Sequence, residues 1–136
     1  MIQRIQTVWL LLASIFIFLT LRLSFYSGIL AAGREYHSML PNDNIFLLIF
    51  TCALGTLLFV NIFLFKNRIL QFRICVISII LEVIILIFTL KNMEYYVKGS
   101  LDIWSVLHLV ILFGIIKATL AIYKDDKLIK DSNRLR

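Results

Sequence analysis

The chain has 136 residues, of which 61% are hydrophobic and only 16% charged, and its mean hydropathy is +0.94. Soluble domains are about half apolar and about a quarter charged, so a chain this short could not cover its apolar surface in water. The composition therefore excludes a soluble domain and predicts a single integral membrane domain.

Four apolar stretches follow one another along the chain, at about residues 5–25, 45–65, 74–90 and 103–123. Each approaches the length of about 20 residues that spans the hydrocarbon region, where backbone polar groups must be satisfied within the segment. The first stretch also resembles a signal peptide, but Ile29–Gly33 is a poor cleavage site, so we expect an uncleaved anchor. The fold class predicted is all-α: an integral-membrane four-helix bundle over 1–123, followed by a basic cytoplasmic tail, 124–136.

The three connections differ in kind. Tyr26–Asn44 is the longest polar segment, with a turn-like run at residues 41–44 and room for a short helix. A tight basic turn joins the second and third stretches, which makes them an antiparallel hairpin. The last connection is Lys91–Asp102.

Charge predicts the orientation. The amino terminus, the basic turn and the tail carry nine basic residues, whereas the other two loops carry four basic residues and four acids. The whole formal charge of +6 therefore lies on one side of the membrane, which by the positive-inside rule makes both termini cytoplasmic. The nine basic residues are Arg4, Lys66, Arg68, Arg73, Lys124, Lys127, Lys130, Arg134 and Arg136.

Glu82 is the one acid within the third stretch, roughly 12 Å from its inner end at 1.5 Å per residue. An ionised carboxylate there costs on the order of 3 kcal/mol, so it must be paired, protonated or hydrated. Small polar residues recur at helical spacing on the same face, which predicts that this face meets other helices and not lipid. This polar line consists of Gln71, Cys75, Ser78, Glu82 and Thr89.

Lys117 lies in the fourth stretch, about 9 Å from the inner surface and within about 3 Å of the depth of Glu82. We expect an intramembrane pair between Glu82 and Lys117, most simply a structural one that joins the third and fourth helices. Two alternatives stay open: a proton- or ion-linked site, or separate partners, with Lys117 reaching lipid headgroups. Gly114 and Ala118 form a small-x-x-x-small pattern that lets two helices approach closely.

The remaining candidate residues favour structural roles. His108 is nine positions from Lys117 and so on the opposite face, and we expect a hydrogen-bonded histidine near the outer interface. His37 has no metal-ligand spacing around it. Cys52 and Cys75 both lie within apolar stretches and are expected to be packed thiols. We find no nucleophile, phosphate-binding or zinc motif, so we expect no enzyme, no cofactor and no metal.

The tail combines five basic and three acidic residues with interleaved Leu128, Ile129 and Leu135. One interpretation is a solvated helix end that anionic headgroups stabilise. The other is docking onto a cytoplasmic protein or a larger membrane assembly. The residues expected to contact a partner or lipid are Lys124, Lys127, Lys130, Arg134 and Arg136.

Three segments, MIQRIQTVWLLLA at the start, FKNRILQFRIC in the centre and KDDKLIKDSNRLR at the end, resemble a family of small four-span membrane proteins from Bacteroidota, classified as domain of unknown function 4293. The resemblance covers nearly the whole chain and is most specific at the two ends. It implies a four-span fold in the inner membrane and implies no reaction.

We therefore expect a non-enzymatic accessory or scaffold subunit of a larger inner-membrane assembly. It would contact membrane lipids and other membrane-protein subunits, with neither nucleic acid nor an identified small-molecule substrate. The alternative is a small proton- or ion-coupled carrier that uses Glu82 and Lys117. A fully paired charge favours the first function, and a water-lined path from Glu82 to one surface favours the second.

Overall fold

The computed structural model describes residues 4–30 and 35–134, without the side chains of Arg4, Leu30 and residues 130–134. Four helices and three short strands make up the described chain. In order they are α1 (Arg4–Thr20), β1 (Tyr26–Leu30), β2 (Tyr36–Met39), η1 (Pro41–Asp43), α2 (Ile45–Phe63), α3 (Arg68–Met93), β3 (Tyr96–Leu101), η2 (Ile103–Ser105) and α4 (Val106–Arg134).

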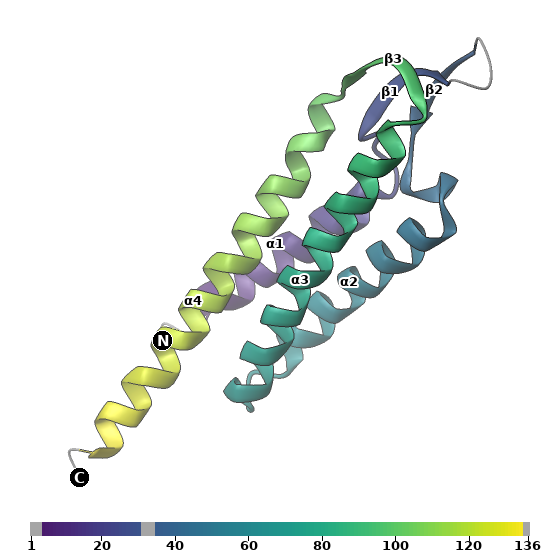
Figure 1. Ribbon diagram of the computed structural model, residues 1–136. Coiled ribbons are helices and arrows are strands. Elements are labelled where there is room, and N and C mark those ends of the chain that lie inside the picture. The colour runs from purple at the N-terminus through teal and green to yellow at the C-terminus, as the bar shows by residue number, and fades with distance from the viewer. Residues whose placement is uncertain (1–3, 31–34, 135–136) are drawn as a thin grey trace.

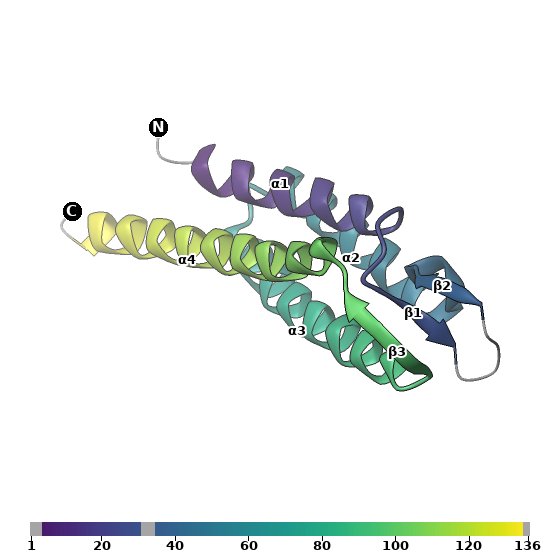
Figure 2. The same ribbon diagram turned by 90° about the horizontal axis from the view of Figure 1, so that it is seen from above.

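The four helices lie side by side, and each packs against two others: α1 and α3 both contact α2 and α4. The strands lie together at one end of the molecule, which we call the sheet end. At the opposite end lie the start of α1, the end of α4 and the turn between α2 and α3 (Figures 1 and 2). We call this the turn end. Both α1 and α4 therefore have their chain-terminal ends on the same side.

Asparagines define the starts of α2 and α3. The Asn44 side chain accepts a hydrogen bond from the Phe46 backbone N–H (3.1 Å), and Asn67 accepts one from that of Leu70 (3.3 Å). Each satisfies a backbone donor that the first helical turn leaves without an intrahelical partner. The short connection before α3 thus turns the chain back sharply and makes α2 and α3 antiparallel neighbours.

Among the described residues, three helical segments are long and apolar enough to cross a membrane: Ile45–Phe63, Arg68–Met93 and Ile103–Ile129. The chain is a membrane protein on this evidence. The first predicted span is shorter than expected, since α1 ends at Thr20 and the next residues turn into β1. Its 17 residues correspond to about 26 Å at 1.5 Å per residue, slightly less than the hydrocarbon thickness of about 30 Å.

Small residues let α1 approach α4 closely. Gly114 and Ala118 are both buried, and a Cβ atom at Gly114 would lie 3.6 Å from the Cβ of Ala13 and 3.7 Å from the carbonyl oxygen of Trp9. The small-x-x-x-small pattern is thus confirmed as a helix-packing site, and its partner is α1. Around it is a continuous apolar core that includes Leu10, Ile17, Leu47, Leu54, Leu58, Ile85, Ile111, Ile115 and Ile122.

The prediction of an all-α fold is wrong at one end. The connections at residues 26–44 and 91–102 form a three-stranded antiparallel sheet in the order β2-β1-β3. The requirement for helices holds only where backbone is exposed to hydrocarbon. Beyond the helix ends the two loops can satisfy their backbone groups by pairing with each other.

Glycines allow β1 and β3 to pair closely. Gly28 lies opposite Gly99, and a Cβ atom at Gly28 would lie only 2.4 Å from the Lys98 carbonyl oxygen and 2.7 Å from the Gly99 Cα. No side chain fits there unless the strands separate. The glycine pair therefore fixes the spacing of the sheet at its centre.

Asp102 ties the sheet to the helices. Its carboxylate accepts hydrogen bonds from the Ser24 and Ser27 hydroxyls, the latter at 2.5 Å. Its backbone N–H donates to the Phe25 carbonyl at 3.2 Å. These bonds join the exit of α1 to the entry of α4. The Ser24 hydrogen bond, and then that of Ser27, lowers the pKa of Asp102 below its usual value.

The Asp102 contacts predict a stability that depends on pH. Because the folded-state pKa is lowered, the stabilisation is present above the ordinary aspartate pKa of about 3.9 and is lost as the pH falls through the folded-state value. We expect Asp102→Asn to lower the unfolding temperature in detergent at neutral pH and to differ less from wild type at strongly acidic pH. An equal difference at both pH values would contradict this assignment.

The basic tail is not separate from the fourth helix. α4 continues without interruption through Lys124 to Arg134, past the turn between α2 and α3, as the yellow part of the ribbon shows (Figure 1). Leu128 and Ile129 are exposed on this extension, whereas Asp125 is buried. The side chains of Lys130 and Arg134, and all of Arg136, lie outside the described residues.

Candidate functional site: a buried carboxylate–histidine pair

The polar line of α3 faces the other helices, as its spacing predicts. The residues of the polar line, Gln71, Cys75, Ser78, Glu82 and Thr89, are all buried, and the one other buried position described in α3 is Ile85. In contrast, the flanking faces of α3 expose large apolar side chains. An amphipathic helix in a membrane places its polar face toward its neighbours in this way.

Glu82 is paired with His108. The Glu82 side chain is fully buried, and its Oε1 lies 2.9 Å from Nδ1 of His108, which is 4% exposed. The imidazole is held edge-on against the Phe25 ring, with the ring centroids 5.4 Å apart. The pair therefore links the middle of α3 to the first turn of α4, next to the chain segment that enters β1.

The predicted pair between Glu82 and Lys117 is wrong. Lys117 points outward from α4, and its Nζ lies 5.1 Å from the centroid of the Phe113 ring. The similar depths of Glu82 and Lys117 in the membrane suggested the pair. Pairing also requires that both side chains point into the same interface between α3 and α4. The neighbouring Ala118 lies on the buried face of α4 and Lys117 does not.

The position of Lys117 explains how its charge is accommodated. Phe113 packs edge-on against Trp9 with ring centroids 6.0 Å apart. Lys117 follows Phe113 by about one helical turn of α4. Because α1 and α4 are antiparallel, this places Lys117 near the start of α1. A long lysine stem can place its ammonium at a membrane interface from there, which is the alternative that the sequence left open for this residue.

At the turn end, Asn61 of α2 completes the polar line. Its Nδ2 donates to the Gln71 carbonyl (3.3 Å) and to the Cys75 sulfur (3.0 Å), while the Gln71 Nε2 donates back to the Asn61 carbonyl (3.2 Å). These reciprocal bonds fasten α2 to α3. Cys75 and Cys52 are both free thiols, and Cys75 acts here as an acceptor within the core.

Several buried oxygens along this line have no hydrogen-bond partner among the described residues: Asn61 Oδ1, Gln71 Oε1, Ser78 Oγ and Glu82 Oε2. A fifth such atom, Oε1 of Gln6, belongs to α1. Buried polar atoms in native proteins usually have partners, which include ordered water. The line thus offers unfilled acceptor positions from the turn end as far as Glu82.

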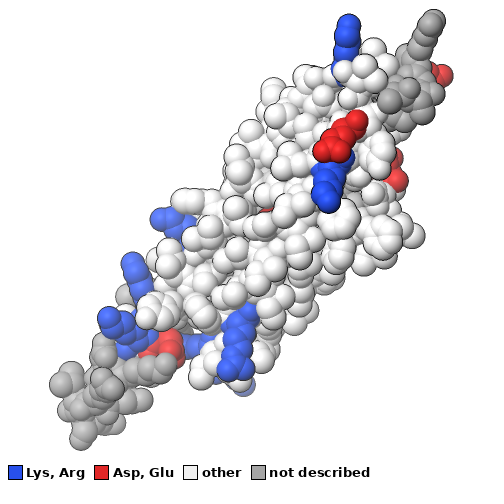
Figure 3. All heavy atoms as spheres, viewed as in Figure 1, with Lys and Arg blue, Asp and Glu red and all other residues white. Residues whose placement is uncertain are grey.

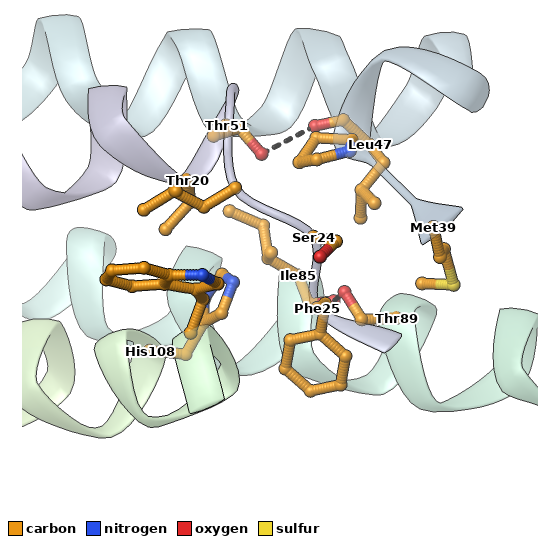
Figure 4. A pocket seen from close by; sticks show the side chains of 12 residues that line it. Thr20, Ser24, Phe25, Met39, Leu47, Thr51, Ile85, Thr89 and His108 are labelled. Atoms are coloured by element: carbon orange, nitrogen blue, oxygen red, sulfur yellow. Dashed lines mark hydrogen bonds between the residues drawn. The ribbon is translucent and has the colours of Figure 1, made fainter. Parts of the chain in front are cut away.

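A small cavity lies at the sheet end of the pair. It is lined by His108 and by residues from the ends of α1, α2 and α3, with Ser24, Phe25 and Met39 beneath the sheet (Figure 4). About 10 Å³ is open to the centre of a water molecule, roughly the space that one buried water needs. The hydroxyls of Thr20, Thr51 and Thr89 line it and donate to carbonyls of their own helices, so the polar groups they offer to a water there are acceptor lone pairs.

The pair can hold a proton in more than one place. With Nδ1 bonded to Glu82, the second ring nitrogen, Nε2, remains for water in the cavity. Either the imidazolium with the carboxylate, or the neutral imidazole with the carboxylic acid, gives a pair without net charge. Loss of that proton leaves one negative charge among apolar helices, which is costly at membrane depth.

Other candidate residues stay apart from this pair. His37 is exposed on β2, and among the described residues no group of three or more His, Cys, Asp or Glu side chains could hold a metal ion. Lys124 and Lys127 are exposed on the extension of α4. On the face shown in Figure 3, charged side chains gather toward the two ends, and those at the turn end are mostly basic.

His108 as the partner of Glu82 was missed, although the sequence contains the signal. His108, Ile111, Ile115, Ala118 and Ile122 recur at intervals of three and four, and all five are buried. This spacing defines the inward face of α4. A search for polar residues on the inward face of α4, instead of for residues at the depth of Glu82, would have selected His108.

The model of one protein family, the domain of unknown function DUF4293, matches residues 2–135. No curated protein and no solved structure gave a significant match. The matched range contains every element described above, including the buried pair, the sheet and the whole of α4. The chain belongs to the DUF4293 family.

Proposed function

We propose that this protein is a non-enzymatic accessory or scaffold subunit of a larger assembly in a bacterial inner membrane. The four helices would form a membrane-spanning bundle with the turn end in the cytoplasm. The observation that carries the proposal is the extension of α4. It extends beyond the other helices at the turn end (Figure 1). Leu128 and Ile129 are 61% and 44% exposed on it, among several charged residues.

The distribution of charge supports the orientation. The described basic residues at the turn end include Lys66, Arg68 and Arg73 from α3 and the turn before it, with Lys124 and Lys127 from α4. The sheet end carries acids and bases in balance. By the positive-inside rule the turn end faces the cytoplasm, so the extension of α4 is available to cytoplasmic parts of other subunits.

The extension also has the composition of a contact surface. Burial of exposed leucine and isoleucine side chains against a partner is favourable by about 25 cal/mol per Å² of apolar surface removed from water. Lys124 and Lys127 lie beside them, so the partner surface that complements the extension is apolar with an acidic margin. The first residues of the extension pack against α3. Asp126 lines a groove with Arg68, Phe72 and Tyr123, and the centroids of the Phe72 and Tyr123 rings lie 6.2 Å apart.

Truncation after Lys127 tests the proposal. This cut keeps the buried Asp125 and also Asp126, and it removes Leu128, Ile129 and the residues beyond them. We expect the truncated protein to insert and to keep its unfolding temperature, because the removed side chains that the structure describes are exposed. We expect its complex to be lost on native gels after extraction in mild detergent, whereas full-length protein migrates with its partner subunit.

The matched control is Val97→Ser, which changes an exposed apolar residue of β3, 69% exposed, at the other end of the molecule. It should leave the migration of the complex unchanged. If the truncated and full-length proteins migrate alike, the extension is not a docking element. If the truncated protein fails to insert, the extension is part of the fold.

A second candidate function is a small proton-coupled carrier. The observation that favours it is Oε2 of Glu82, which lies within the buried polar line and has no hydrogen-bond partner among the described residues. The residues involved would be Glu82 and His108, without Lys117. A proton flux across vesicles that contain the purified protein, abolished by Glu82→Gln, would select this candidate over the first.

A further inference from the structure

We propose that Glu82 and His108 form a proton-binding site that exchanges protons with water at the sheet end, through the cavity beneath β1. The proposal holds whether the protein is an accessory subunit or a carrier. Its ligand is a proton delivered by water, and its two parts are a buried acceptor pair and a one-sided route of access.

The first step is the placement of His108 between the cavity and Glu82. The imidazole lines the cavity, while its Nδ1 lies 2.9 Å from Glu82 Oε1. Glu82 itself is fully buried and does not line the cavity. Any proton that passes between cavity water and the carboxylate on this route must pass over the imidazole.

The second step is the proton transfer that this geometry allows. A hydronium ion in the cavity gives its proton to Nε2 of His108 and becomes water. The proton on Nδ1 moves to Oε1 of Glu82, which leaves a neutral imidazole protonated at Nε2 and a carboxylic acid. One proton has entered the site, and the reverse sequence releases it. Imidazole is suited to this role because its two nitrogens can accept and donate in turn.

The third step is the neutrality of the surroundings. Among the described residues, the buried side chains on the other elements are polar but uncharged, such as Gln6 and Ser14 of α1 and Thr51 of α2. On α3 itself the other titratable buried group is Cys75, and Asp125 of α4 is buried toward the turn end. No lysine or arginine of the described chain forms an ion pair with Glu82. The pair thus depends on its own proton for neutrality.

Asp102 marks the outer side of the same route. Its carboxylate accepts a hydrogen bond from Ser24, which also lines the cavity. Ser24 and Leu23 are partly exposed, and Trp104, another lining residue, is 51% exposed. The cavity therefore lies close beneath the surface at the sheet end, and Ser24 connects its lining to the Asp102 carboxylate.

Proton uptake by purified protein in lipid nanodiscs tests the site. The pH is changed over a range that begins below the ordinary glutamate pKa of about 4.3 and ends at strongly alkaline values, because loss of the proton is costly at membrane depth, and protons taken up per chain are counted. Wild type should take up one proton more than Glu82→Gln with His108→Phe. Infrared spectra should show that a carboxylic acid band appears with this proton, and that Glu82→Gln removes the band.

The route is tested by the rate of proton exchange. Thr20→Leu fills the cavity, and it should slow the change of the carboxylic acid band after a pH jump without altering its final size. The matched control is Thr56→Leu, a substitution at an exposed position of α2, which should leave the rate unchanged. His37→Gln removes the exposed histidine and should have no effect on the band.

Two results would overturn the proposal. Equal proton uptake by wild type and the double variant would show that the pair binds no exchangeable proton. A rate that falls with Gln71→Leu, at the turn end of the polar line, and not with Thr20→Leu would show that the proton enters from the opposite side.

Discussion

Replacing His108 with phenylalanine is expected to lower the free energy of unfolding by about 3–5 kcal/mol, the cost of leaving a buried charge without its partner. The ring of phenylalanine fills most of the space of the imidazole but cannot bond to Oε1 of Glu82. Because Glu82 is fully buried and its Oε2 already lacks a hydrogen-bond partner among the described residues, the carboxyl group would then have no partner within that part of the chain. The measurement is reversible unfolding in detergent micelles.

The double variant Glu82→Leu with His108→Phe should be far more stable than His108→Phe alone. No orphan charge remains, and an apolar pair of similar volume can be accommodated among helices. The two substitutions must therefore be strongly non-additive, as expected for residues in contact. Lys117→Met is the control, and it should change stability little, since Lys117 is exposed. Additive losses from the Glu82 and His108 changes would contradict the pairing.

The second large effect is expected at the sheet. Gly28→Val should lower the free energy of unfolding by about 1–3 kcal/mol, the usual cost of overpacking. A Cβ atom at Gly28 would lie 2.4 Å from a backbone carbonyl oxygen of β3, and backbone cannot move aside as a flexible side chain can. We expect β1 and β3 to separate, which also opens the cavity above His108.

Ser100→Val is the matched control for the sheet. It places the same side chain on β3, where Ser100 is exposed and pairs with Ser27 of β1. Valine favours strands, so this variant should be neutral or slightly stabilising. Equal losses for Gly28→Val and Ser100→Val would show that the close approach of the glycines does not limit the fold.

The sequence predicts the helices well because hydrophobicity and spacing act locally. The second to fourth helices and the inward face of α3 follow from runs of apolar residues and from intervals of three and four. The sheet does not follow from such signals. β1 and β3 are about seventy residues apart along the chain, and neither strand shows a regular alternation that would identify it alone.

The partner of Glu82 was predicted wrongly because the prediction compared the depths of residues in the membrane and did not consider on which face of α4 each side chain lies. Counting residues places Lys117 near the level of Glu82, but the core face of α4 runs through His108, Ile111 and Ile115. A buried polar group must lie on the face that meets its partner. The depth of His108 relative to Glu82 depends on how far α4 is tilted and shifted along α3. Contacts between helices determine that tilt and shift, and the sequence of one helix does not contain them.

The most direct test of the buried pair is a solid-state NMR measurement on labelled protein in lipid bilayers, which reads the proximity of His108 Nδ1 to the Glu82 carboxyl carbon. The structure predicts a strong short-range correlation between them, in keeping with the 2.9 Å contact from Nδ1 to Oε1. A correlation from the Glu82 carboxyl carbon to Lys117 Nζ, with none to His108, would contradict it.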